Sequence, residues 1–89
     1  MQRFNFTKSF LGANGISTTV GFTTPDTEEA AMKTEAAKRS MITIVLADHT
    51  KFNKVFSVTF AELRSTCIIT DQLADKAFKD ITVVKEVLV

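Results

Sequence analysis

Four polar side chains of different chemistry follow one another directly after an apolar run near the middle of the chain. The run "MITIVLA" ends at Ala47, and Asp48, His49, Thr50 and Lys51 come next. Lys51 could offer a positive charge to a phosphate or carboxylate, Thr50 a hydroxyl, and Asp48 an acceptor for sugar hydroxyls or for Lys51 itself. Turn formation alone favours the same residue types. Spacing alone therefore leaves a ligand site and an ordinary solvated turn both open.

Two further polar segments carry candidate chemistry. "GANGIS" contains Asn14 and Gly15, a pair that permits positive φ and favours a tight turn, but it matches neither the dinucleotide fingerprint nor the P-loop. "GFTTPDTEEA" predicts a helix N-terminus, whose N–H groups attract anions, although Asp26 and Glu28 already compensate that end. Glu29 could act as a base beside a pocket, and helix capping alone also explains it.

A nucleophilic or metal-assisted mechanism has little support. His49 is the single histidine, and the single cysteine, Cys67, lies in the apolar run "TCIIT". A Cys-His or Ser-His-Asp constellation would have to be built around His49, and no spacing typical of metal ligands is present. We therefore expect no catalytic residue, no metal site and no cofactor, with His49 as a loop residue beside a ligand pocket.

Hydrophobic periodicity predicts an α/β fold with a largely parallel sheet. We expect strands at residues 8–11, 41–47, 66–70 and 81–88, with 55–60 as a half-exposed strand or an extended connection. The run 41–47 is apolar almost without alternation, which is typical of a parallel strand covered on both faces.

The helical signals are clearest after Thr24. A helix is expected from there to Met41, with Ala30, Ala37 and Met41 facing the sheet. One helical turn is expected at 61–65, and a second helix at 71–80, capped by Thr70 or Asp71. Because ligands bind outside the carboxyl ends of parallel strands, the loops "GANGIS" and "ADHTKF" are the places to look for a site.

The composition is that of a folded, soluble protein. Hydrophobic residues make up 45% of the 89 residues and charged residues 24%, with a formal net charge of +1. The basic residues are spread along the chain, so no electrostatic footprint for nucleic acid is seen. No apolar run approaches the roughly 20 residues of a membrane helix. We expect a cytoplasmic chain without membrane contact, and a length this short for a doubly wound sheet suggests a fragment.

Four motifs in this order and spacing, "FLGANGIS", "GFTTPDTEEAAMK", "VLADHTKF" and "ITD", resemble the carboxy-terminal effector domain of the DeoR family of bacterial transcriptional regulators. The resemblance covers residues 3 to about 88 and corresponds to the later half of that domain. Residues 1–89 are therefore expected to be one single-domain fragment. The family's amino-terminal winged helix-turn-helix and the phosphate loop of its sensor are expected to precede it.

The resemblance implies a Rossmann-like three-layer α/β fold, here truncated, related to ribose-5-phosphate isomerase and the coenzyme A transferases. It implies an effector sensor of a repressor of sugar metabolism, binding a phosphorylated sugar that modulates operator binding, usually within a homo-oligomer. DNA would be contacted only through the missing winged helix-turn-helix. The sequences of these motifs resemble those of regulators of sugar phosphotransferase operons, such as the operons for lactose or fructose.

The family motifs carry ligand contacts onto eight residues of this sequence. Match to Asp-x-Ser-Lys-Phe implies Asp48, Thr50 and Lys51 as ligand-binding residues. The remaining matches lie in the family's Gly-Ala-(Asp/Asn)-Gly turn and Thr-Thr-Pro helix start: Asn14, Gly15, Thr23, Thr24 and Glu29. Thr50 replaces the usual serine and keeps the hydroxyl. Asn53 stands where glycine is common, and asparagine tolerates positive φ.

An enzyme of the same fold is the alternative to a regulator. A sugar-phosphate isomerase-like fragment would use Glu29 as base and Lys51 to bind phosphate. The "TTPD" segment lacks the lysine-glycine-glycine run of such isomerases, so the resemblance favours a regulator that is not an enzyme.

Overall fold

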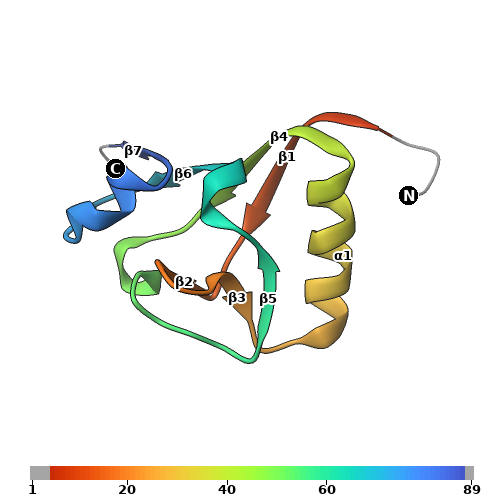
Figure 1. Ribbon diagram of the computed structural model, residues 1–89, viewed down its shortest axis with the longest axis horizontal. Helices are drawn as coiled ribbons and strands as arrows, with labels where there is room; N and C mark the ends of the chain where they lie inside the picture. The colour runs from red at the N-terminus through yellow and green to blue at the C-terminus, as the bar shows by residue number, and fades with distance from the viewer. Residues whose placement is uncertain (1–4, 88–89) are drawn as a thin grey trace.

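The computed structural model describes residues 5–87 and consists of two sheets and one α-helix. A four-stranded sheet holds β1 (Phe6–Gly12), β4 (Ser40–Leu46), β6 (Thr66–Thr70) and β7 (Val83–Glu86) in the order β1-β4-β6-β7. Every pair of neighbours in it is parallel. Figure 1 shows β1 and β4 between α1 on one side and β6 and β7 on the other. The predicted α/β fold with a largely parallel sheet is confirmed.

A second, antiparallel sheet is formed by β2 (Gly15–Ser17), β3 (Gly21–Thr24) and β5 (Val58–Ala61). The sequence predicted only a loop where the β2–β3 hairpin lies, because its strands are too short to show alternation. The turn of this hairpin ends at Gly21, where β3 begins, and the φ of 84° at this residue is one that glycine adopts readily. The segment 55–60, left open between strand and connection, supplies most of β5.

Helix α1 (Thr27–Lys38) begins later and ends earlier than predicted. Asp26 caps it, its carboxylate accepting from the N–H groups of Glu28 and Glu29, at 2.8 and 3.3 Å. At the other end the Ser40 hydroxyl donates to the Ala36 carbonyl at 2.6 Å, and β4 starts there. The helix cannot reach Met41, which lies on β4 and is 84% exposed, so its predicted place against the sheet is wrong.

The second predicted helix, at 71–80, is also wrong over its first half. Only the 3₁₀ segment η3 (Lys76–Asp80) forms, and its cap is Asp75 rather than Thr70 or Asp71. The Leu73 N–H is instead bound by the Glu86 carboxylate at 2.6 Å, which ties this stretch to the end of β7. The single turn expected at 61–65 is present as η2 (Leu63–Ser65).

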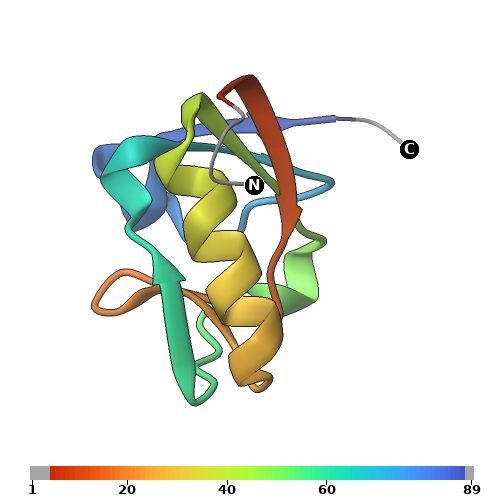
Figure 2. The ribbon, with the colours of Figure 1, turned by 90° about the vertical axis from the view of Figure 1, so that its right-hand side faces the viewer.

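The core lies between one face of the parallel sheet, α1 and the second sheet. Figure 2 shows α1 in front of β1 and β4, with β5 beside it. The largest fully buried apolar side chains come from the two sheets and from η3, and none comes from α1: Phe22, Phe78, Ile16, Ile68 and Val45. Packing of α1 on the sheet therefore uses small residues such as Ala30, which lets the helix approach closely.

The opposite face of the parallel sheet has no cover among residues 5–87. Phe10, Ile42 and Leu46 on β1 and β4 are 60%, 46% and 47% exposed, and Val83 on β7 is 58% exposed. The order of the strands across the sheet, β1-β4-β6-β7, is also their order in the chain. Right-handed crossovers between them then place every connection on the same face of the sheet. The expectation that residues 41–47 are covered on both faces is therefore wrong for the described chain.

Gly15 lies where two segments meet most tightly. A Cβ on it would stand 2.3 Å from the Lys54 carbonyl oxygen and 2.7 Å from Thr23 Oγ1. We predict that Gly15→Ala lowers the free energy of unfolding by about 2 to 3 kcal/mol, because backbone must move to make room. Gly12→Ala is the matched control, since its Cβ would meet nothing within 4 Å. Urea denaturation of both variants checks this, and equal stabilities would contradict it.

Candidate functional site

The residues Asp48, Thr50 and Lys51 lie on one exposed turn at the carboxyl edge of the parallel sheet. Thr50 and Lys51 belong to the 3₁₀ turn η1 (His49–Lys51), and Asp48, two residues after the end of β4, caps it. The Asp48 carboxylate accepts from the Thr50 N–H at 2.9 Å and from the Thr50 hydroxyl. Asp48 and Thr50 are thus fixed to each other before any ligand arrives.

This arrangement favours the ionised form of Asp48. The hydrogen bond from the Thr50 hydroxyl lowers the pKa of Asp48 most, followed by the Thr50 N–H, with a further contribution from the charge of Lys51. Partial desolvation and the charge of Asp71 oppose that shift. An anionic acceptor beside a lysine ammonium results, which suits a ligand carrying both hydroxyl and anionic groups.

The turn is docked onto the segment that carries Asn14 and Gly15. Phe52 forms a parallel bridge with Ile16, and the Asn53 N–H donates to the Ile16 carbonyl at 2.7 Å. Asn53 adopts a φ of 62°. This agrees with the expectation from the family motif, in which glycine is common at this position. The structure therefore brings two turns side by side, residues 12–15 (the "GANG" turn) and residues 48–51 (the "DHTK" turn).

Thr23 and Thr24 lie beneath this site and are fully buried. The Thr23 hydroxyl accepts from the Phe56 N–H at 3.0 Å and lies 3.4 Å from the Gly15 carbonyl, so it joins three segments. The Thr24 hydroxyl has no hydrogen-bond partner within residues 5–87. Their role as ligand contacts stays a prediction, while the geometry shows Thr23 supporting the site from below.

Glu29 lies apart from the turn, exposed in the first turn of α1. Lys33, one helical turn later, reaches the sheet edge, where its Nζ donates to the Gly12 carbonyl at 2.7 Å and stands 5.2 Å from the Phe60 ring centroid. Sequence reasoning missed Lys33. Its position three residues after Ala30 puts it on the sheet-facing stripe, and that spacing could have indicated it.

His49 and Asp71 form a second contact that sequence reasoning missed. The His49 N–H and its ring Nδ1 lie 2.8 and 2.9 Å from the two carboxylate oxygens of Asp71. The hydrogen bond from the His49 side chain is the main cause that lowers the pKa of Asp71. Both residues follow neighbouring parallel strands, in which Leu46 pairs with Ile69, and this register could have indicated that they meet.

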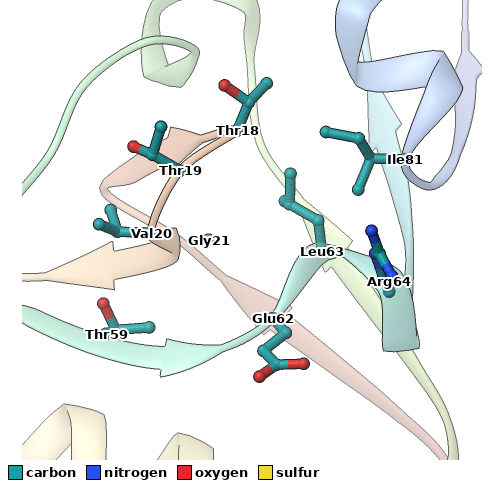
Figure 3. A pocket seen from close by; sticks show the side chains of 9 residues that line it. All are labelled: Thr18, Thr19, Val20, Gly21, Thr59, Glu62, Leu63, Arg64 and Ile81. Carbon is teal, nitrogen blue, oxygen red and sulfur yellow. The ribbon is translucent and has the colours of Figure 1, made fainter.

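A separate hollow of about 300 Å³ lies at the other end of the sheet. Figure 3 shows the hairpin residues Thr18 and Val20 on one side, Arg64 and Ile81 on the other, and Leu63 between them. None of the eight predicted ligand residues lines it. Because it lies near the amino ends of β6 and β7, it is away from the loops where parallel sheets usually bind ligands.

The bond between Thr50 and Asp48 gives a direct test of the turn. We predict that Thr50→Val raises the pKa of Asp48 toward the ordinary value of 3.8, because the hydroxyl donor is lost. Because the pKa of Asp48 is lower in the folded state than in the unfolded state, its ionised form stabilises the fold at pH values above the ordinary pKa. This stabilisation is lost as the pH falls through the folded-state pKa, so the variant should lose less stability on acidification. NMR titration of the side-chain carboxyls measures this, with Asp71 as the internal control, and an unchanged Asp48 would contradict it.

No helix among residues 5–87 is long and apolar enough to cross a membrane.

Comparison with known proteins gives one consistent family. The family model "DeoR C terminal sensor domain" matches residues 1–72. The chain is 42% identical to the uncharacterized HTH-type transcriptional regulator FruR of Bacillus subtilis, over 98% of this chain and 36% of that protein. It is 33% identical to the HTH-type transcriptional regulator IolR of the same bacterium, over 88% of this chain and 32% of that protein. With the HTH-type transcriptional regulator GlpR of Haloferax volcanii it shares 36% identity, over 84% of this chain and 30% of that protein.

The chain thus spans about a third of the length of the curated relatives it matches. The matched region holds the "GANG" and "DHTK" turns, which the structure brings side by side, and the "TTPD" helix start. On this evidence the chain belongs to the DeoR C-terminal sensor domain family.

Proposed function

We propose that this chain is the effector-sensing part of a DNA-binding transcriptional repressor of sugar metabolism, and that it binds a phosphorylated sugar that modulates operator binding. The observation that carries the proposal is the joining of the "DHTK" and "GANG" turns at the carboxyl edge of a parallel sheet. The relatives, named as HTH-type transcriptional regulators, support the regulatory role.

The chemistry of the turn fits such a ligand. Lys51 is half-buried, and no ion pair to it occurs among the described residues, so its ammonium can meet a phosphate. Asp48 has carboxylate lone pairs beyond those used by Thr50, and these can accept from sugar hydroxyls. Asn14, exposed on the neighbouring turn, adds an amide that can both donate and accept.

Regulation then requires two states of the whole regulator. We propose that the winged helix-turn-helix lies in the part of the protein that corresponds to the remaining two thirds of the relatives, and that the protein acts in the cytoplasm as a homo-oligomer. The effector changes operator occupancy only if it binds the DNA-bound and released states with different affinity.

Substitution of Lys51 tests the site. In the full-length regulator, Lys51→Ala and Asp48→Ala should each weaken binding of the effective sugar phosphate by about tenfold to a hundredfold, because a charge-assisted hydrogen bond is lost. Lys54→Ala is the matched control, since Lys54 is an exposed lysine just beyond the turn. Calorimetric titration with hexose and pentose phosphates measures binding, and operator release gives the functional readout. Wild-type affinity in both variants would sink the proposed site.

We also propose that the uncovered sheet face is the inner side of a third layer, as in a Rossmann-like three-layer domain of which residues 1–89 are the later part. Parallel sheets are normally buried on both faces, and Phe10, Ile42 and Leu46 form an apolar strip on this one. In doubly wound sheets, further strands added beside β1 carry their connections on the opposite face. The carboxyl end of β1, where the "GANG" turn lies, would then be the point at which the strand order reverses.

The exposed strip predicts how the 89-residue chain behaves alone. It should self-associate and bind a hydrophobic dye, and Phe10→Lys should reduce both effects because a charge interrupts the strip. Met32→Lys is the control, since Met32 is 67% exposed on α1 rather than on this face. Sedimentation and dye fluorescence measure the two properties. A monomeric wild-type chain without dye binding would contradict the proposed layer.

A further inference from the structure

The loops after β4 and β6 are joined by one residue pair. The backbone N–H of His49 donates to Oδ1 of Asp71 at 2.8 Å, and Nδ1 of His49 lies 2.9 Å from Oδ2. A carboxylate only accepts hydrogen bonds, so Nδ1 carries the proton in this contact. Asp71 therefore holds His49 by two bonds that involve both its oxygens, an arrangement that fixes orientation as well as distance.

The turn that carries Asp48 and Lys51 depends on such fixing, because none of the residues of η1 is buried. On its far side the chain is anchored by packing, with the Phe52 ring edge-on to Phe78 at a centroid distance of 4.9 Å. On its near side the last backbone bond to the sheet is made by Ala47, which donates to the Ile69 carbonyl at 3.1 Å. Between these two anchors, Asp71 is the group outside the turn that holds it, among the contacts of the described residues.

Charge gives the pair a second consequence. Asp71 lies close enough to Asp48 to oppose its ionisation, while the charge of Lys51 favours it. With His49 in place, the oxygens of Asp71 are occupied by its two N–H donors. Without His49, Asp71 would keep only the Thr70 hydroxyl as a side-chain donor, at 3.3 Å, and its less compensated charge would act more strongly on Asp48.

We propose that His49 and Asp71 are positioning residues, a clamp that holds the Asp48–Lys51 turn in its ligand-binding geometry. The inference rests on the proposed function for its effect on affinity, but the clamp itself can be observed without any effector. In this proposal neither residue contacts the ligand, and His49 acts by holding the turn to which it belongs.

The first measurement uses the full-length regulator without effector. In ¹⁵N NMR at alkaline pH, where histidine side chains are neutral, His49 should populate the tautomer with the proton on Nδ1, and Asp71→Ala should abolish that preference. A wild-type His49 with the proton on Nε2 would overturn the clamp whatever the effector does.

The second measurement compares affinities for glucose 6-phosphate, fructose 6-phosphate and fructose 1-phosphate. His49→Ala and Asp71→Ala should each weaken the best of these by about threefold to tenfold, the loss expected for exposed hydrogen bonds. His49→Asn should restore most of the affinity, since its amide can donate where Nδ1 did. The double variant His49→Ala/Asp71→Ala should be no weaker than the weaker single variant, because the two residues act as one unit.

The outcomes separate this inference from the proposed function. If the wild-type regulator binds none of the three sugar phosphates, the proposed ligand class fails, while the NMR result still decides the clamp. If Lys51→Ala loses binding but His49→Ala and Asp71→Ala do not, the site stands and the clamp is overturned. Additive losses in the double variant, or a failure of His49→Asn to restore binding, would also overturn it.

Discussion

The packing of the segment after η1 against the β2–β3 hairpin is the contact on which the rest of the structure depends. Gly15 has no side chain, so the Lys54 carbonyl can lie against it, and the Thr23 hydroxyl bonds the Phe56 N–H from the other side. Asn53 turns the chain with positive φ and donates to Ile16. This joint fastens the antiparallel sheet to the carboxyl edge of the parallel one, and it places two polar turns side by side.

The polar groups at that edge are organised by short hydrogen-bonded units rather than by burial. Asp48 is bonded to Thr50 within its own turn, and Asp71 is bonded to His49 across two loops. Exposed ion pairs and hydrogen bonds contribute little stability, so these units are better understood as fixing geometry. Lys33 adds a cation at the end of β1, where its ammonium donates a hydrogen bond to the Gly12 carbonyl. The apolar sheet thus carries a polar edge whose geometry is fixed by hydrogen bonds between exposed side chains and backbone.

The elements that followed the sequence closely are those with long, uniform patterns. Strands β4, β6 and β7 were predicted because runs rich in β-branched residues are a local signal, and β1 was predicted from the short segment 8–11 before a turn. The β2–β3 hairpin was missed because its strands are too short to show alternation, and the break of the helix predicted at 71–80 was missed because it depends on distant partners. The Glu86 carboxylate accepts a hydrogen bond from the Leu73 N–H, 13 residues earlier in the chain. The carboxylate of Asp71, which had been expected to cap a helix, instead accepts from the His49 N–H. Asp48, Thr50 and Lys51 were predicted together as ligand residues, whereas His49 was expected only as a loop residue beside the pocket, Asp71 only as a possible helix cap, and Lys33 had no predicted role.

By itself the sequence determined the fold class, the family and the turn on which a ligand site could lie, because strand periodicity, caps and motif order are local properties. Only the tertiary structure decided which turns meet, that Thr23 and Thr24 lie buried beneath the site, and that one face of the sheet stays apolar and uncovered. Those facts follow from strand order and register, which bring residues 22 positions apart, such as His49 and Asp71, within hydrogen-bond distance. No local pattern records that pairing, since each residue alone suits an ordinary loop.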